Sequence, residues 1–81
     1  MREQLRKIIE THGRLNTPAS ILSDDSDLFA AGLDSLAVVN VMLAIEDEFE
    51  IEFHDGLLTR QSFSSIEALE KAVLSSRALA S

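Results

Sequence analysis

The residues with the clearest chemical potential lie together in the run Gly32-Leu33-Asp34-Ser35-Leu36, directly before an apolar stretch. A helix that begins here would place the Ser35 hydroxyl at its N-terminus, where free backbone N–H groups and the helix dipole favour an attached phosphate. Asp34 could help to hold a divalent cation while a phosphoryl-containing group is transferred. Gly32 would let another molecule approach the backbone closely. A serine here is also an ordinary helix cap, so the run permits phosphate chemistry without establishing it.

Helices must position this run, and apolar periodicity and capping residues predict where they lie. A first helix is expected over about residues 2–13, with His12 bordering the core at its end. Residues 14–34 are rich in turn-forming side chains and predict a long loop, and loops of this length in small domains tend to be functional. Asp34 or Ser35 then caps a second helix, which is expected to run to about Phe49.

The second half of the chain predicts two more helical segments. A short helix is expected near residues 57–61, after a surface loop that holds His54. Ser64-Ser65-Ile66-Glu67 has the pattern of a capping box with Ser64 as the N-cap, and the last helix should run from it to about Ser75. Residues 1–81 are therefore predicted to form a single domain, ordered over about residues 3–75, with a frayed tail at 76–81.

The second helix is apolar on two opposed sides. At about 100° per residue, one arc forms a typical core stripe, which consists of Val38, Val41, Met42, Ile45 and Phe49. The opposite arc carries Leu36, Val39 and Leu43, followed by Asp47. Both sides could be buried in a small bundle, or the second arc could be an exposed apolar strip that marks a binding surface. We predict the second alternative, because one small helix rarely buries both of its sides.

The charge of the chain argues against one class of partner and suggests another. Seven Lys and Arg residues against fourteen Asp and Glu residues give a formal net charge of −7, which makes nucleic acid an unsuitable partner. No Lys or Arg occurs between Leu15 and Thr59. Ten of the acids lie in that stretch: Asp24, Asp25, Asp27, Asp34, Glu46, Asp47, Glu48, Glu50, Glu52 and Asp55. They indicate either a solubilising surface or a docking face for basic partners.

Taken with its surroundings, the run at residues 32–36 resembles the phosphopantetheine attachment motif of acyl carrier proteins and their peptidyl carrier relatives. The resemblance covers about residues 3–75 and includes Leu28-Phe29 upstream and the entry to the last helix, Phe63-Ser64-Ser65-Ile66. It implies an all-α fold, a small antiparallel bundle of three main helices plus one short helix. It also implies that Ser35 carries a 4′-phosphopantetheine arm derived from coenzyme A, whose thiol bears the cargo as a thioester.

The resemblance further implies site residues and partners. Gly32, Asp34 and Leu36 would surround the attachment point at Ser35. The residues expected to meet partner enzymes are Leu36, Val39, Asn40, Leu43, Asp47 and Asp55. Those partners would be a phosphopantetheinyl transferase, an acyl- or aminoacyl-loading ligase, and transferases or synthases with basic docking surfaces. The chain itself is expected to be a monomer.

The chain departs from the common pattern of carriers in fatty acid biosynthesis. His54 stands where a proline is usual, and Ala37 and Asn40 are neutral where acids are frequent. We therefore expect an acyl-type cargo in a specialised branch of lipid metabolism or in a secondary-metabolite pathway. The alternatives are an aminoacyl or peptidyl carrier, and an unmodified helical interaction module.

An enzyme is not expected. A serine hydrolase needs a base and an oxyanion hole, and the glycines of a nucleophile elbow are missing, because Leu33 and Ala37 flank Ser35 at two residues on each side. The absence of cysteine and the presence of only two histidines argue against a structural zinc site, and no resident metal is expected. The longest mostly apolar stretch, Leu36–Ile45, is too short to span a bilayer. A cytoplasmic location is the expectation.

Overall fold

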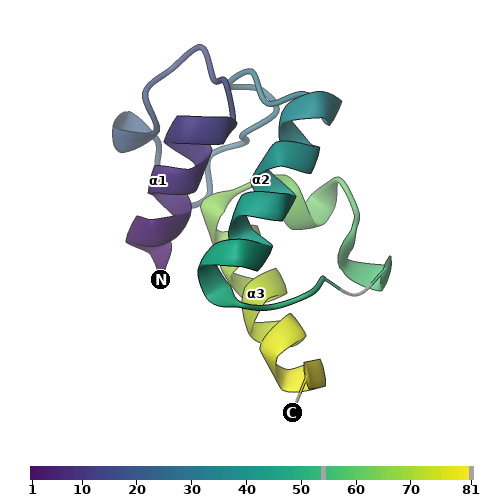
Figure 1. Cartoon of the computed structure of the whole chain (residues 1–81). Coiled ribbons are helices and arrows are strands. Elements are labelled where there is room, and N and C mark those ends of the chain that lie inside the picture. Colours follow the sequence, from purple (N-terminus) through teal and green to yellow (C-terminus); the bar gives the residue numbers. More distant parts are fainter. Residues whose placement is uncertain (54, 81) are drawn as a thin grey trace.

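The computed structural model of the chain describes residues 1–53 and 55–80, which form an all-α bundle. Its three α-helices are α1 (Arg2–His12), α2 (Ser35–Phe49) and α3 (Ile66–Ala80). Short 3-10 helices occur at η1 (Ala19–Ile21), η2 (Asp55–Leu57) and η3 (Gln61–Phe63), and no strand occurs in the described part of the chain. Helix α1 runs opposite in direction to α2 and α3 (Figure 1). The predicted fold class is confirmed.

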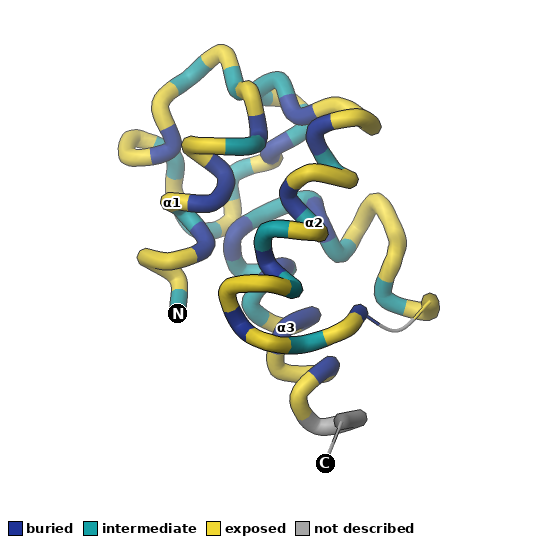
Figure 2. Tube along the Cα trace, viewed as in Figure 1, coloured by how far each residue is buried: buried dark blue, intermediate teal, exposed yellow. Residues whose placement is uncertain are grey.

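The core lies where the three helices and the two connecting segments meet. The buried apolar side chains are Leu5, Ile8, Ile9, Ala19, Leu28, Leu33, Ala37, Val41, Ile45, Phe49, Phe53, Phe63, Ile66, Leu69, Ala72 and Val73. Figure 2 shows buried positions recurring along the inner side of each helix. Three residues of the predicted α2 stripe, Val41, Ile45 and Phe49, belong to this core. Val38 and Met42 are only half-buried, while the small Ala37 is completely buried.

Side-chain caps fix where α2 and α3 begin. The Oδ1 atom of Asp34 accepts a hydrogen bond from the backbone N–H of Ala37 at 2.8 Å, so Asp34 is the N-cap that starts α2 at Ser35. In α3 the cap is Ser65, whose Oγ accepts from the N–H of Ala68 at 3.0 Å. The prediction of Ser64 as N-cap was wrong by one residue, because the Ser64 hydroxyl donates instead to the carbonyl of Gln61.

The segment between α2 and α3 differs from the expected single short helix at 57–61. Two 3-10 turns, η2 and η3, form on either side of Leu58 and Thr59. The Thr59 Oγ1 accepts a hydrogen bond from the Ser62 N–H at 3.2 Å, so Thr59 nucleates η3 and no helix runs through it. His54, which was expected in a surface loop, lies outside the described residues.

Helix α3 continues to Ala80, beyond the end predicted near Ser75. A tertiary contact accompanies the extra turn: the Arg77 guanidinium carbon lies 5.5 Å from the centre of the Phe49 ring of α2. Ser76 is buried, and its hydroxyl has no hydrogen-bond partner in the described part of the chain. The tail that was predicted to fray from Ser76 is therefore helical as far as Ala80, and Ser81 lies outside the described residues.

The long loop before α2 is fastened to the bundle by arginines of α1. Arg6 donates to the carbonyls of Ala19 at 2.6 Å and Leu22 at 2.7 Å, and its guanidinium also pairs with Asp24. Arg2 pairs with both Asp24 and Glu70, which joins the loop to α3 as well. These hydrogen bonds from Arg6 and then Arg2 lower the pKa of Asp24 below its ordinary value. The network holds the loop that leads to Ser35.

Candidate functional site

Ser35 stands exposed as the first residue of α2, at the end of the fastened loop. Among the described residues, no hydrogen bond engages its hydroxyl. The positive end of the α2 dipole lies at this position. The first turn of the helix contains no acidic residue, and the acid nearest in sequence is the exposed N-cap Asp34. The hydroxyl is therefore free for modification, in a field that favours a phosphate ester.

Gly32 shapes the approach to Ser35 in a way that the sequence did not predict. Its φ angle is +118°, which side-chain-bearing residues rarely adopt, and an added Cβ would lie 3.0 Å from the backbone nitrogen of Asn16. The same Asn16 nitrogen donates to the carbonyl of Ala31 at 2.7 Å. The close approach expected at Gly32 thus comes from this chain's own loop, and the glycine holds the turn into α2.

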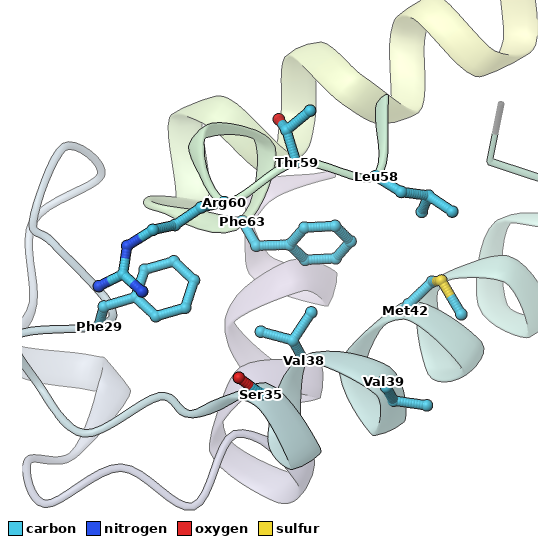
Figure 3. A pocket seen from close by; sticks show the side chains of 9 residues that line it. All are labelled: Phe29, Ser35, Val38, Val39, Met42, Leu58, Thr59, Arg60 and Phe63. Atoms are coloured by element: carbon cyan, nitrogen blue, oxygen red, sulfur yellow. The ribbon is translucent and has the colours of Figure 1, made fainter. Parts of the chain in front are cut away.

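An open groove of about 420 Å³ lies between α2 and the segment that follows η2 (Figure 3). Its wall is mostly apolar and includes the Ser35 side chain at the start of α2. The lining residues are Phe29, Ser35, Val38, Val39, Met42, Leu58, Thr59, Arg60 and Phe63. This groove was not predicted from the sequence, which placed Val38 and Met42 in the core stripe of α2. Leu58 was the local signal that could have indicated the groove, because a large apolar side chain in a turn-rich segment can mark a binding surface.

The groove contains a single charged residue. The guanidinium carbon of Arg60 lies 3.9 Å from the centre of the Phe29 ring, a cation–π contact at the rim of the groove, and Figure 3 shows the two side chains next to each other. No carboxylate lies within ion-pair distance of Arg60 in the described part of the chain. Among the described residues, no His, Asp or Glu lines the groove, so its known lining offers Ser35 no general base.

The predicted strip on α2 is exposed. Leu36 is 75%, Val39 48% and Leu43 54% exposed, which excludes the alternative in which both sides of the helix are buried. Asn40 and Asp47 are also exposed on α2, while Asp55 is exposed on the separate turn η2. Val39 lies at the edge of the strip and lines the groove. The structure thus brings Leu36, Asn40, Leu43 and Asp47 onto one face, and their use in docking stays a prediction.

His12 does not approach Ser35. It ends α1, half-buried, and lines a separate hollow between α1 and α2 with Asp47 and Glu48. Asp34 is exposed next to Ser35 but uses one carboxylate oxygen as the helix cap. None of the helices in the described part of the chain combines the length and apolar character that crossing a bilayer needs.

Comparison with known proteins agrees with this geometry. The family described as the phosphopantetheine attachment site matches residues 3–73. An aminoacyl carrier protein of Agrobacterium fabrum is 49% identical over 73 residues, which cover 90% of this chain and 88% of that protein. A carrier protein from Agrobacterium tumefaciens, crystallised with an engineered Bradyrhizobium japonicum glycine:[carrier protein] ligase and AMP, has 49% identity and a TM-score of 0.88. That match covers 91% of this chain and 99% of the other.

A more distant structure shows a glycylated carrier protein with Bradyrhizobium japonicum glycine:[carrier protein] ligase. It has 27% identity and a TM-score of 0.74, and the match covers 88% of this chain and 95% of the other. The chain belongs to the phosphopantetheine-attachment family of carrier proteins, and its cofactor is a covalently attached 4′-phosphopantetheine. The exposed, unbonded Ser35 hydroxyl beside an apolar groove fits such a group.

Proposed function

We propose that this protein is an aminoacyl carrier that bears its 4′-phosphopantetheine on Ser35 and presents an amino acid to partner enzymes. The observation that carries the proposal is the placement of the Ser35 hydroxyl, which is exposed, unbonded and at the start of α2. When bound, the group supplies a thiol that holds the cargo as a thioester on a long flexible chain. The bundle positions the attachment point and does no chemistry on the cargo itself.

Attachment would proceed by substitution at phosphorus. The Ser35 oxygen forms a bond to the phosphorus of coenzyme A that bears pantetheine, while the bond from this phosphorus to the bridging pyrophosphate oxygen breaks. The products are a phosphodiester on Ser35 and adenosine 3′,5′-bisphosphate, and the hydroxyl proton passes to a base of the transferase. No base lines the groove among the described residues, and Asp34 caps α2, so we assign the base to a phosphopantetheinyl transferase. The exposed Asp34 carboxylate next to Ser35 could share a divalent cation with that enzyme.

An aminoacyl cargo has better support than the acyl cargo expected from the sequence. The similar proteins carry the name aminoacyl carrier protein, and two similar structures were solved with an amino-acid ligase. The comparisons give no support to fatty acid biosynthesis or lipid metabolism. The groove bears on where such a cargo would lie, not on which cargo is carried. A protonated amino group finds no carboxylate among the lining residues and meets the cation of Arg60, so this cargo would remain outside the groove.

The partners then follow from charge and exposure. A loading ligase with a basic surface could meet the exposed strip Leu36, Val39 and Leu43 together with Asn40, Asp47 and Asp55. Complementary charge would speed the encounter, while the apolar strip would supply most of the binding free energy. Monomeric state and cytoplasmic location stay predictions.

The cargo can be identified directly on the native protein. Hydroxylamine should release the thioester-bound group, and mass spectrometry of the resulting hydroxamate gives its identity. We expect an amino acid hydroxamate from the wild-type protein and nothing from Ser35→Ala. A fatty acyl hydroxamate would refute the aminoacyl assignment and return the cargo to the acyl class.

A further inference from the structure

Arg60 is the one basic residue in a long acidic part of the chain. No other Lys or Arg occurs between Arg14 and Lys71, and Arg60 lines the same groove as Ser35. In Figure 3 both side chains lie at the same end of this groove, with Phe29 beneath the guanidinium. A cation thus lines the same groove as the hydroxyl that would become a phosphodiester.

The other arginines for which the structure shows side-chain contacts have different roles. Arg2 and Arg6 form ion pairs with Asp24, and Arg2 also pairs with Glu70. Arg77 lies over Phe49 on the far part of the bundle. Arg60, by contrast, is exposed, and its described contact is with the face of an aromatic ring. Such an exposed contact is weak, so the guanidinium can readily exchange it for, or share it with, an anion.

A phosphodiester on Ser35 would add a negative charge to a chain that already has a net charge of −7. The helix terminus offsets part of that charge, but it cannot fix the direction in which the ester leaves the protein. A guanidinium can do so, because its planar set of donors matches two phosphate oxygens at once.

We propose that Arg60 is a positioning residue for the prosthetic arm and binds the phosphodiester oxygens on Ser35. Phe29 holds the guanidinium at the rim of the groove until the anion is present. The contact would join the start of α2 to the segment between η2 and η3, on opposite sides of the groove. The phosphodiester end of the arm then has a fixed direction at the protein surface, while the thiol end remains mobile. This inference rests on the proposed attachment at Ser35.

The test compares apo and holo protein by NMR, after intact mass has shown that the arm is attached. In the wild-type protein, the Arg60 Nε–Hε signal should shift on conversion from apo to holo, and that of Arg77 should not. The ³¹P signal of the holo protein should relax as part of the folded domain. In Arg60→Gln the ³¹P signal should narrow as the phosphodiester becomes mobile. In Arg60→Lys the signal should stay partly broadened, because a cation remains at the position. Arg77→Gln, which removes a cation from the other aromatic contact, should behave as wild type.

The outcomes separate the two proposals. An unchanged mass after treatment with coenzyme A and a transferase would overturn the attachment site itself. If the arm is attached but the Arg60 Nε–Hε signal does not shift, the role of Arg60 alone is overturned. This measurement uses only the wild-type chain, so it does not depend on whether a variant folds. If the ³¹P signal narrowed equally in Arg60→Gln and Arg77→Gln, the narrowing would result from the change in net charge. That outcome would also overturn the role of Arg60. Added salt should narrow the wild-type ³¹P signal towards that of Arg60→Gln.

Discussion

The roles of the two sides of α2 can be distinguished by truncating one side chain on each side. Leu43 is 54% exposed on the strip, whereas Ile45 is 0% exposed in the core. We predict that Leu43→Ala impairs docking and leaves the fold intact, and that Ile45→Ala does the reverse. Leu74, which is 50% exposed on α3, provides a matched control for the loss of an exposed leucine away from α2.

The expected magnitudes follow from the buried fractions. Full burial of a leucine side chain stabilises a protein by about 1.5–3 kcal/mol, so the half-exposed Leu43 contributes about 1 kcal/mol. The higher helix propensity of alanine does not reverse this small loss. Ile45→Ala removes a fully buried side chain and leaves a cavity, which costs about 2–5 kcal/mol. For docking, the loss of an apolar anchor of about 1.4 kcal/mol lowers kcat/KM for the transferase about tenfold.

Urea denaturation of the three variants gives the change in the free energy of unfolding, and a mass-based loading assay gives kcat/KM. Leu74→Ala should match Leu43→Ala in stability and the wild type in loading. If Leu43→Ala lost as much stability as Ile45→Ala, the strip would be part of the core. If it loaded as fast as Leu74→Ala, the docking surface would have to lie among the acids and the loop before Ser35.

Three further predictions concern the loop, its ion pairs and the acidic face. Gly32→Ala should destabilise the fold by about 1–3 kcal/mol in urea denaturation, because φ is +118° and the new Cβ would crowd Asn16, and unchanged stability would contradict this. The folded-state pKa of Asp24 is lowered by Arg6, so the stability that Asp24 contributes is present above its unfolded pKa of about 3.9 and is lost as the pH falls through the folded value. Asp24→Asn should therefore be less stable than wild type at pH 7, with a gap that narrows as the pH falls through the folded-state pKa of Asp24, and a gap of constant size would refute the linkage. Asp47→Lys should slow association with the transferase at low salt and weaken its salt dependence, whereas an unchanged rate would assign this acid to solubility alone.

Local sequence signals were sufficient for α1 and α2 and for the position of Ser35. The cap at Asp34 and the burial of Ile45 depend on residues only a few positions apart, so periodicity and capping rules predict them. The N-cap of α3 was misplaced because two adjacent serines compete for the position, and boundaries are uncertain by a residue or two. The bond from the Ala68 N–H to the Ser65 hydroxyl and the bond from the Ser64 hydroxyl to the Gln61 carbonyl decide between them.

Other features depend on contacts between distant segments and could not be predicted locally. The groove exists because residues 57–63 pack beside α2 at a distance that leaves Val38 and Met42 half-buried. The extension of α3 depends on the contact between Arg77 and Phe49, which are far apart in the sequence. The pairing of Arg60 with Phe29 has the same origin. Propensity describes a residue's neighbours in the chain, whereas these features arise from neighbours in space.

The central claim, that Ser35 is the attachment point of the arm, has one direct measurement. Apo protein is incubated with coenzyme A and a phosphopantetheinyl transferase, and intact mass is measured for the wild type and for Ser35→Ala. The wild type should gain the mass of one phosphopantetheine, located on Ser35 by fragmentation, and the folded variant should gain none. A mass gain that persists in Ser35→Ala, or a correctly folded wild type that gains none, would contradict the account.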